Sequence, residues 1–207
     1  MRSSRCGFTV VETVVALSLL SLLLLGLYAV LTIGYRQARE AEVFETVHRE
    51  AMVGVKKLTQ EIELTSRGSF SDLSSGPTFV IFASPQQLQS APNFEQYSYD
   101  GNGDLRWQKW VCYYLDSADQ TVYRAEMALP SPVPAPPTAA TQPPLSDFQA
   151  LSAAERKPVF RNCSQLRFRV GTTPASVRMT LETSDNVNSD KVTRILIDNE
   201  IVPRNTV

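Results

Sequence analysis

The sequence predicts an α+β protein in which a long N-terminal helix packs on an antiparallel β-sheet head. Three observations support this fold class: an uncharged apolar run near the N-terminus, an amphipathic helical pattern directly after it, and six short β-type segments in the remainder. The 207 residues suffice for one modest domain and one further element. The formal net charge of -1 gives no general attraction to nucleic acid or acidic lipid.

The apolar run is a predicted membrane span. From Thr13 to Tyr35 the chain carries no charged residue, and as a helix this run crosses a hydrocarbon layer of roughly 30 Å. Arg2 and Arg5 precede it, so the positive-inside tendency predicts a cytoplasmic N-terminus and a head on the far side. The alternative is a cleaved secretory signal peptide, whose apolar core of about 7 to 15 residues is shorter and precedes a small-residue cleavage site.

One carboxylate, Glu12, lies at the start of this run. An uncompensated charge in a membrane costs at least a few kcal/mol, so Glu12 is expected to have a partner or a function. No cation lies near it along the helix. Cleavage between Gly7 and Phe8 would create an α-amino group four residues before Glu12, on the same helical face.

The segment GFTVVE at residues 7–12, with its short basic leader and the apolar helix that follows, resembles the class III signal of type IV pilins and type II secretion pseudopilins. The resemblance implies a pilin-like fold, a prepilin peptidase that cuts after Gly7 and methylates the Phe8 amine, and an inner-membrane assembly platform. It also implies that Glu12 is unsatisfied in the lipid and pairs with the Phe8 amine of a neighbouring pilin or pseudopilin in the filament.

The helix is predicted to continue beyond the membrane to about Arg67. An apolar stripe recurs every three or four residues, formed by Phe44, Val47, Ala51, Val55, Leu58, Ile62 and Thr65. The chain then divides into a leader (1–7), a transmembrane and assembly helix (8–35), its amphipathic continuation (36–67) and a β-rich head (68–207). His48, the only histidine, has no accompanying cluster of metal-ligating residues and is not expected to be catalytic.

Six segments of the head are predicted strands because they are short, β-branched or aromatic, and bounded by turn residues: Thr78–Ser84, Leu105–Asp116, Thr121–Met127, Gln165–Gly171, Ser176–Thr183 and Val192–Val202. Leu166, Phe168 and Val170 are expected to face the core on one strand, and Val177, Met179 and Leu181 on the next. The Pro-rich stretch 129–145 is predicted to be an extended surface loop, with a linker between two domains as the alternative.

Two further patterns in the head leave alternatives open. Asp100, Asn102 and Asp104 alternate like the opening of a calcium loop, but the turn glycine and bidentate glutamate of such a loop are missing. A Gly-rich turn leading into the next strand is therefore the favoured interpretation, with calcium binding as the alternative. Cys112 and Cys163 lie in predicted strands or at strand edges, where they either form a disulfide in an oxidising compartment or remain buried thiols.

The functional interpretation is a non-enzymatic minor pilin or pseudopilin that initiates or caps a type IV pilus or a type II secretion pseudopilus. The stretch WVCYYLDSADQTVYRAE resembles a hairpin of the J-type minor pseudopilin and the W-type minor pilin. The implied location is the bacterial inner membrane, with a single span and a periplasmic or external head. Two alternatives are a DNA-uptake minor pilin, for which Arg167 and Arg169 are candidate contacts, and a membrane-anchored binding module that never polymerises.

Overall fold

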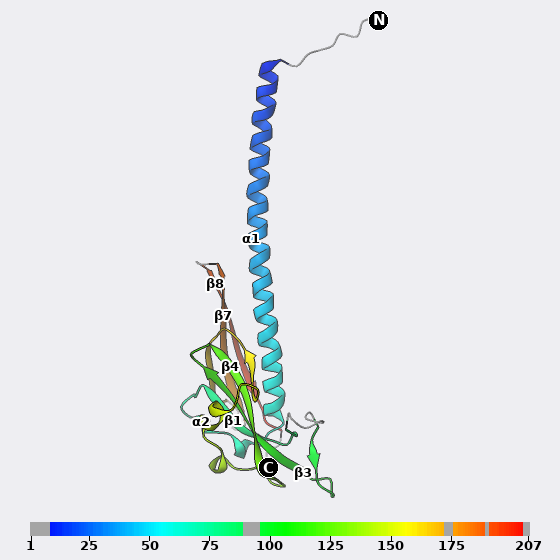
Figure 1. Cartoon of the computed structure of the whole chain (residues 1–207), viewed down its shortest axis with the longest axis vertical. Helices are drawn as coiled ribbons and strands as arrows, with labels where there is room; N and C mark the ends of the chain where they lie inside the picture. The colour runs from blue at the N-terminus through cyan, green and yellow to red at the C-terminus, as the bar shows by residue number, and fades with distance from the viewer. Residues whose placement is uncertain (1–8, 89–95, 172–175, 189–190, 205–207) are drawn as a thin grey trace. The chain divides into compact units, whose positions relative to one another are not determined.

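The computed structural model describes residues 9–88, 96–171, 176–188 and 191–204, with the side chains of 185–188 and 191–193 left out of the description. Helix α1 spans Val10–Glu63 without a break (Figure 1). The chain divides into two compact units, residues 1–44 and 45–207, and each is described by itself. The α+β fold class is confirmed: a long apolar N-terminal helix is followed by antiparallel sheets.

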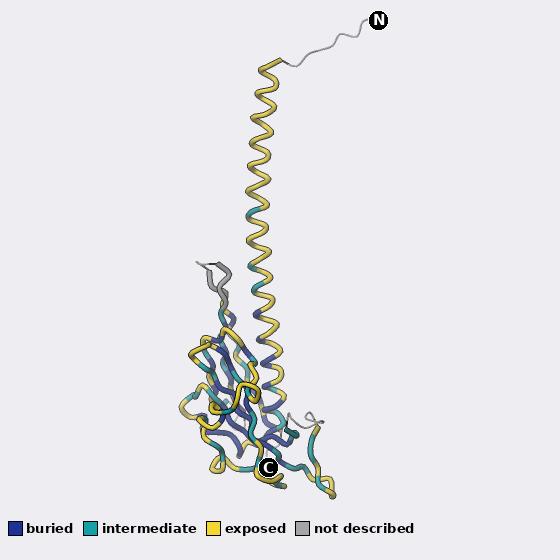
Figure 2. Tube along the Cα trace, in the orientation of Figure 1, coloured by how far each residue is buried: buried dark blue, intermediate teal, exposed yellow. Residues whose placement is uncertain are grey.

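In the first unit, the described residues are all helical from Val10 onwards. Every large apolar side chain between Val10 and Tyr35 is exposed, as the yellow trace in Figure 2 shows. Among the described residues, α1 is the one helix long and apolar enough to cross a membrane. A helix whose whole circumference is apolar needs an apolar surrounding, which a bilayer or a bundle of similar helices supplies.

The second unit is built from strands that form two antiparallel sheets. The strands are β1 (Phe79–Ser84), β2 (Ser98–Tyr99), β3 (Leu105–Asp116), β4 (Thr121–Val133), β5 (Arg156–Phe160), β6 (Cys163–Val170), β7 (Val177–Asn188) and β8 (Lys191–Ile201). The order is β1-β3-β4-β5 in the larger sheet, with β2 paired to β3, and β6-β7-β8 in the smaller sheet. All six predicted strands are present, whereas β2 and β5 were not predicted.

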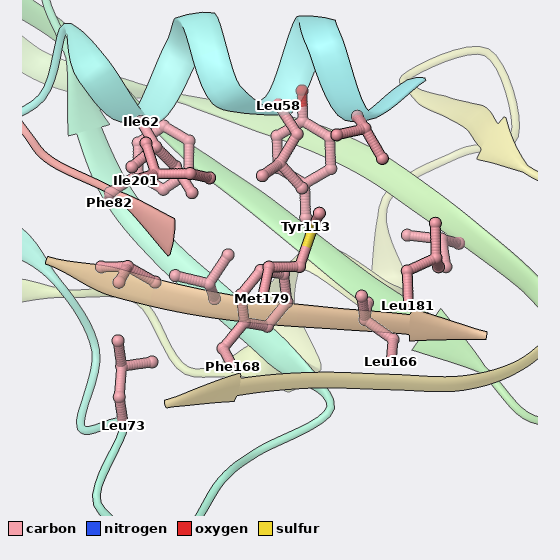
Figure 3. Packing of buried hydrophobic residues seen from close by; sticks show 14 of the residues in the cluster. Leu58, Ile62, Leu73, Phe82, Tyr113, Leu166, Phe168, Met179, Leu181 and Ile201 are labelled. Atoms are coloured by element: carbon pink, nitrogen blue, oxygen red, sulfur yellow. The ribbon is translucent and has the colours of Figure 1, made fainter. Parts of the chain in front are cut away.

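The larger sheet is covered on both faces. Successive apolar residues of β3 point to opposite faces of the sheet and pack in two different clusters. Val111 and Tyr113 of β3 pack in one core cluster, together with the second half of α1 and the inner faces of β6, β7 and β8. Figure 3 shows Leu58 and Ile62 of α1 above this cluster. Trp110 of β3 packs on the opposite face, in a second cluster that includes Phe148 of the short helix α2 (Leu145–Ala150). Burial on both faces explains why residues 110–115 of β3 form a continuous apolar run.

The predicted burial pattern holds with two exceptions. The stripe on α1 is buried from Val47 to Ile62, whereas Phe44 is 48% exposed. On β6, Leu166 and Phe168 are fully buried, but Val170 at the strand end is 56% exposed. Both exceptions lie at the end of an apolar pattern.

The Pro-rich stretch 129–145 is not a continuous loop, so this prediction is wrong at both ends. Strand β4 continues to Val133, which pairs with Trp107 of β3, and α2 begins at Leu145. Pro130 and Pro132 lie between the last two paired positions, inside an irregularity of the ladder where no N–H donor is required. A 3-10 turn η2 (Ala139–Thr141) completes the segment.

Candidate functional site

The first candidate site is the beginning of α1, where Thr9 stands immediately before the first helical residue. The backbone N–H and the hydroxyl of Thr9 both donate to Glu12 Oε2, at 3.0 and 3.1 Å. In return, the Glu12 backbone N–H donates to the Thr9 hydroxyl oxygen at 3.3 Å. This reciprocal arrangement is a capping box, which satisfies N–H groups that have no partner within the helix.

Thr9 thus provides Glu12 Oε2 with two donors within the same subunit, so this oxygen is satisfied before assembly. The pairing of Glu12 with the Phe8 amine of a neighbouring subunit stays a prediction. The T-x-x-E spacing of Thr9 and Glu12 is the sequence signal that predicts this arrangement. Within the described residues, both of these side-chain hydrogen bonds go to Oε2, and Glu12 Oε1 accepts none. The positive end of the helix dipole also stabilises a carboxylate at this position. Gly7 and Phe8 lie outside the described residues.

The second candidate site is a buried ionic network in the head, between α1 and the larger sheet. Glu61 of α1 accepts hydrogen bonds from Arg124 Nε of β4 at 3.0 and 3.1 Å, and from the Tyr113 hydroxyl of β3 at 2.8 Å. Arg124 Nη1 also donates to Glu126 at 3.1 Å. Lys109 Nζ donates to the same Glu126 oxygen and to the Gln87 carbonyl, each at 2.7 Å. Opposite charges thus alternate across the helix–sheet junction.

Burial determines the electrostatics of this network. The side chains of Lys109, Arg124 and Glu61 are 2%, 4% and 7% exposed. Desolvation lowers the pKa of Lys109, while the hydrogen bond to Glu126 partly offsets it. For Arg124, burial is the largest single effect and acts to lower the pKa, but Glu61, Tyr113 and Glu126 together outweigh it and the pKa is raised. Desolvation and Glu61 raise the pKa of Tyr113, so its hydroxyl stays protonated as a donor.

Sequence reasoning missed this network. Glu61 stands one residue before the stripe residue Ile62, and charged residues beside an apolar stripe ordinarily face solvent. The alternating Arg124 and Glu126 on β4 indicate a polar strand face, but no local pattern identifies Glu61 as the partner of Arg124, 63 residues away.

Comparison with known proteins bears on the first site. Residues 2–28 match the family model of the prokaryotic N-terminal methylation motif. The chain carries the type IV pilin and pseudopilin signal. No curated protein and no solved structure matches the chain. The matched residues include Gly7, Phe8, Thr9 and Glu12, so the capping box lies inside the signal.

The pilin-type signal supports a pilin or pseudopilin subunit that a prepilin peptidase processes and that assembles with other pilin subunits. Such a subunit is usually structural rather than enzymatic. Together with the apolar α1, the signal fits a membrane-anchored protein.

The two head cysteines of this pilin-type chain are free, buried thiols, in place of the disulfide that was one of the two predicted alternatives. Cys163 packs in the cluster under α1, and Cys112 packs in the cluster under α2, on the other face of the larger sheet. The sheet separates them. Burial raises the pKa of both thiols, that of Cys163 to about 12.

The residues of the calcium-like pattern form the turn between β2 and β3. Asp100 Oδ1 accepts the backbone N–H groups of Asn102 and Asp104, each at 2.9 Å, and Oδ2 accepts Arg106 Nη2 at 3.3 Å. Gly103 has a φ of 86°, which a glycine adopts without strain. Within the described part of the chain, no three His, Cys, Asp or Glu residues are grouped to hold a metal ion.

Acidic residues partly neutralise the positive charge of the arginines on the smaller sheet. Arg178 pairs with Asp198 across β7 and β8, and Arg194 lies 4.0 Å from Glu182. Arg167 and Arg169 are exposed on the same strand face. The alternation of charge on this face is typical of a solvated sheet surface and weakens the nucleic-acid interpretation.

Proposed function

We propose that this protein is a minor pilin or pseudopilin, a structural subunit that helps to initiate or cap a type IV pilus or a type II secretion pseudopilus. The observation that carries the proposal is the methylation motif at residues 2–28, in which Glu12 lies in the first turn of a helix that is otherwise uncharged up to Tyr35. A head of this size, with a Pro-rich segment between β4 and α2, favours a minor subunit over the abundant one.

The proposed mechanism begins at the leader. A prepilin peptidase cuts between Gly7 and Phe8 and methylates the new amine, while the head lies in the periplasm or beyond. Thr9 holds Glu12 Oε2 in the isolated subunit. In the filament, the Phe8 amine of a neighbouring subunit pairs with Glu12, and Oε1 is the oxygen still available to it. Contact between apolar helices supplies most of the assembly energy, while this ion pair sets their axial registry.

The capping box lowers the free-energy cost of holding Glu12 in the membrane before assembly. A carboxylate that already accepts two donors is partly compensated before assembly, so the subunit can wait in the membrane at a lower cost. Because the neighbouring amine carries a full charge, its hydrogen bond to the carboxylate is stronger than one from a neutral donor. The pairing is therefore favourable in addition to the capping box.

The first test is the intact mass and N-terminal sequence of the protein from membranes with and without the prepilin peptidase. We expect a methylated Phe8 at the N-terminus when the peptidase is present. A chain that still begins at Met1 in the presence of the peptidase would contradict the proposal and favour an anchored module.

The second test replaces Glu12 by Leu, with Ser18→Leu as the matched control in the same helix. Ser18 only donates to the Val14 carbonyl one turn earlier, so its loss removes no candidate intersubunit contact. We expect the E12L protein to be inserted and cleaved normally. The number of filaments, or the amount of secreted protein, should fall roughly tenfold, because a charge pair in apolar surroundings contributes a few kcal/mol to assembly. Equal assembly of both variants would exclude the pairing role.

A further inference from the structure

A pocket of about 590 Å³ opens beside the ionic network, wholly within residues 45–207. Its wall on α1 includes Lys56, Lys57 and Gln60, and its opposite wall includes Lys109, Arg124 and Tyr97. The pocket therefore combines two exposed lysines on the helix with two buried cations on the sheet.

The acidic residues of the pocket are already engaged. Glu61 is held by Arg124 and Tyr113, and Glu126 by Arg124 and Lys109. Glu63 pairs with Arg204, which does not line the pocket, at 2.8 Å. These carboxylates leave no acidic partner for a further cation of the pocket.

Two cations of the pocket, Lys56 and Lys57, make no ion pair or hydrogen bond with any described residue. Lys57 is the one whose ammonium group is partly desolvated. Desolvation lowers the pKa of the Lys57 ammonium, and the nearby positive charge of Arg124 lowers it further, ahead of the opposing effect of Glu61. Lys157 of β5 adds positive charge at the same position. Glu61 and Glu126 oppose these effects only in part, so an anion that enters the pocket would further stabilise the Lys57 ammonium.

The apolar rim of the pocket indicates which kind of molecule carries the anion. Val53 lines the pocket and is 65% exposed, and Leu64 lies on the same wall. A small free anion would occupy the cationic part and leave this apolar rim in water. A carboxylate attached to a polypeptide would cover the rim as well, and these surrounding contacts would exclude water from the charge pair.

We propose that this pocket binds a carboxylate presented by an acidic segment of a partner protein, with Lys57 as the principal counterion and Lys56 at the entrance. The inference stands on the pocket, its charge and its apolar rim. It goes beyond the proposed pilin function, and it holds whether or not the chain polymerises.

The test measures binding of a fluorescein-labelled, N-acetylated tetraglutamate peptide to the full chain in detergent micelles, by fluorescence anisotropy at low and at physiological salt. The variant is Lys57→Gln, alone and with Lys56→Gln. The matched control is Arg167→Gln, which removes one exposed positive charge from a different sheet face. Thermal unfolding verifies that all variants are equally folded.

We expect saturable binding that Lys57→Gln weakens about tenfold and that Arg167→Gln leaves unchanged, as for the loss of one partner of a close charge pair. Absence of saturable binding, or an equal loss in both variants, would overturn the proposal. Free glutarate is the competing probe. If glutarate binds as tightly as the peptide, the pocket is a small-carboxylate site and the protein-partner assignment is overturned.

Discussion

The guanidinium of Arg124 donates one N–H to both carboxylate oxygens of Glu61, at 3.0 and 3.1 Å. This contact joins the second half of α1 to β4, across 63 residues of sequence. The Tyr113 hydroxyl of β3, the strand paired with β4, also donates to Glu61. The head thus attaches to its helix by a charged contact as well as by the apolar cluster around Leu58 and Ile62.

Replacement of Glu61 by Gln should destabilise the head strongly. The change leaves Arg124 buried with less counter-charge, and loss of one partner of a buried pair costs about 3 kcal/mol or more. Urea unfolding followed by the fluorescence of Trp107 and Trp110, which are 3% and 2% exposed, measures the effect.

The control for this variant is Glu45→Gln. Glu45 pairs with Arg49 on the same helix, but both side chains are more than two thirds exposed, so we expect little change. Equal effects of the two variants would show that the buried network contributes nothing beyond an exposed helical pair.

Gly54→Ala should also destabilise the head, although alanine favours helix. An added Cβ would lie 2.8 Å from Cδ1 and Cζ of the Phe160 ring, closer than real Cβ contacts. Overpacking costs about 1 to 3 kcal/mol, against a gain in helix propensity of about 1 kcal/mol. We expect a net loss of about 1 kcal/mol in the same urea assay.

Two further variants isolate the cause of this loss. Gly34→Ala makes the same change in α1 where no atom lies within 4 Å of the added Cβ, so it should leave the head unaffected. Phe160→Leu combined with Gly54→Ala should recover part of the loss, because the smaller side chain makes room. Additive effects of the two changes would rule out a steric cause.

Cys112 and Cys163 should resist alkylation in the folded protein. Only the thiolate reacts, and burial raises the pKa of both thiols, that of Cys163 to about 12, so the thiolate is rare at pH 8. Iodoacetamide followed by intact mass should give no modification of the processed chain before unfolding and two modifications after it. A disulfide in the non-reduced protein would contradict the placement of the two thiols on opposite faces of the sheet.

Asp100→Asn should reduce stability at neutral pH and have less effect in acid. The backbone N–H groups of Asp104 and Asn102 hold the pKa of Asp100 below its ordinary value. A lowered folded-state pKa means that the ionised carboxylate contributes stability above about pH 4, and that this contribution is lost as pH falls through the folded-state pKa. Thermal unfolding of wild type and variant from pH 7 to pH 2.5 should therefore give curves that converge toward acid.

Asp104→Asn provides the comparison for that experiment. The Asp104 side chain makes no hydrogen bond with a described residue, although its backbone contributes to the same turn. We expect its stability to follow wild type across the pH range. A constant difference between wild type and Asp100→Asn at every pH would show that the charge of Asp100 does not matter.

The N-terminal helix of this protein could be predicted from sequence because its determinants are local. An uncharged run sets the span, the stripe from Val47 to Ile62 sets the buried helix face, and T-x-x-E sets the capping box. Alternation of side chains within β6 and β7 likewise predicts their buried faces, since a strand places successive residues on opposite sides.

Only the tertiary structure decided which of these surfaces meet. The order of the strands, the separation of Cys112 from Cys163 and the pairing of Glu61 with Arg124 all depend on contacts between distant segments. The same holds for β5, whose exposed Lys157 and Pro158 give little strand signal until β4 pairs with them. Periodicity in a sequence specifies a face of an element, whereas the partner of that face is selected by burial and charge compensation across the whole fold.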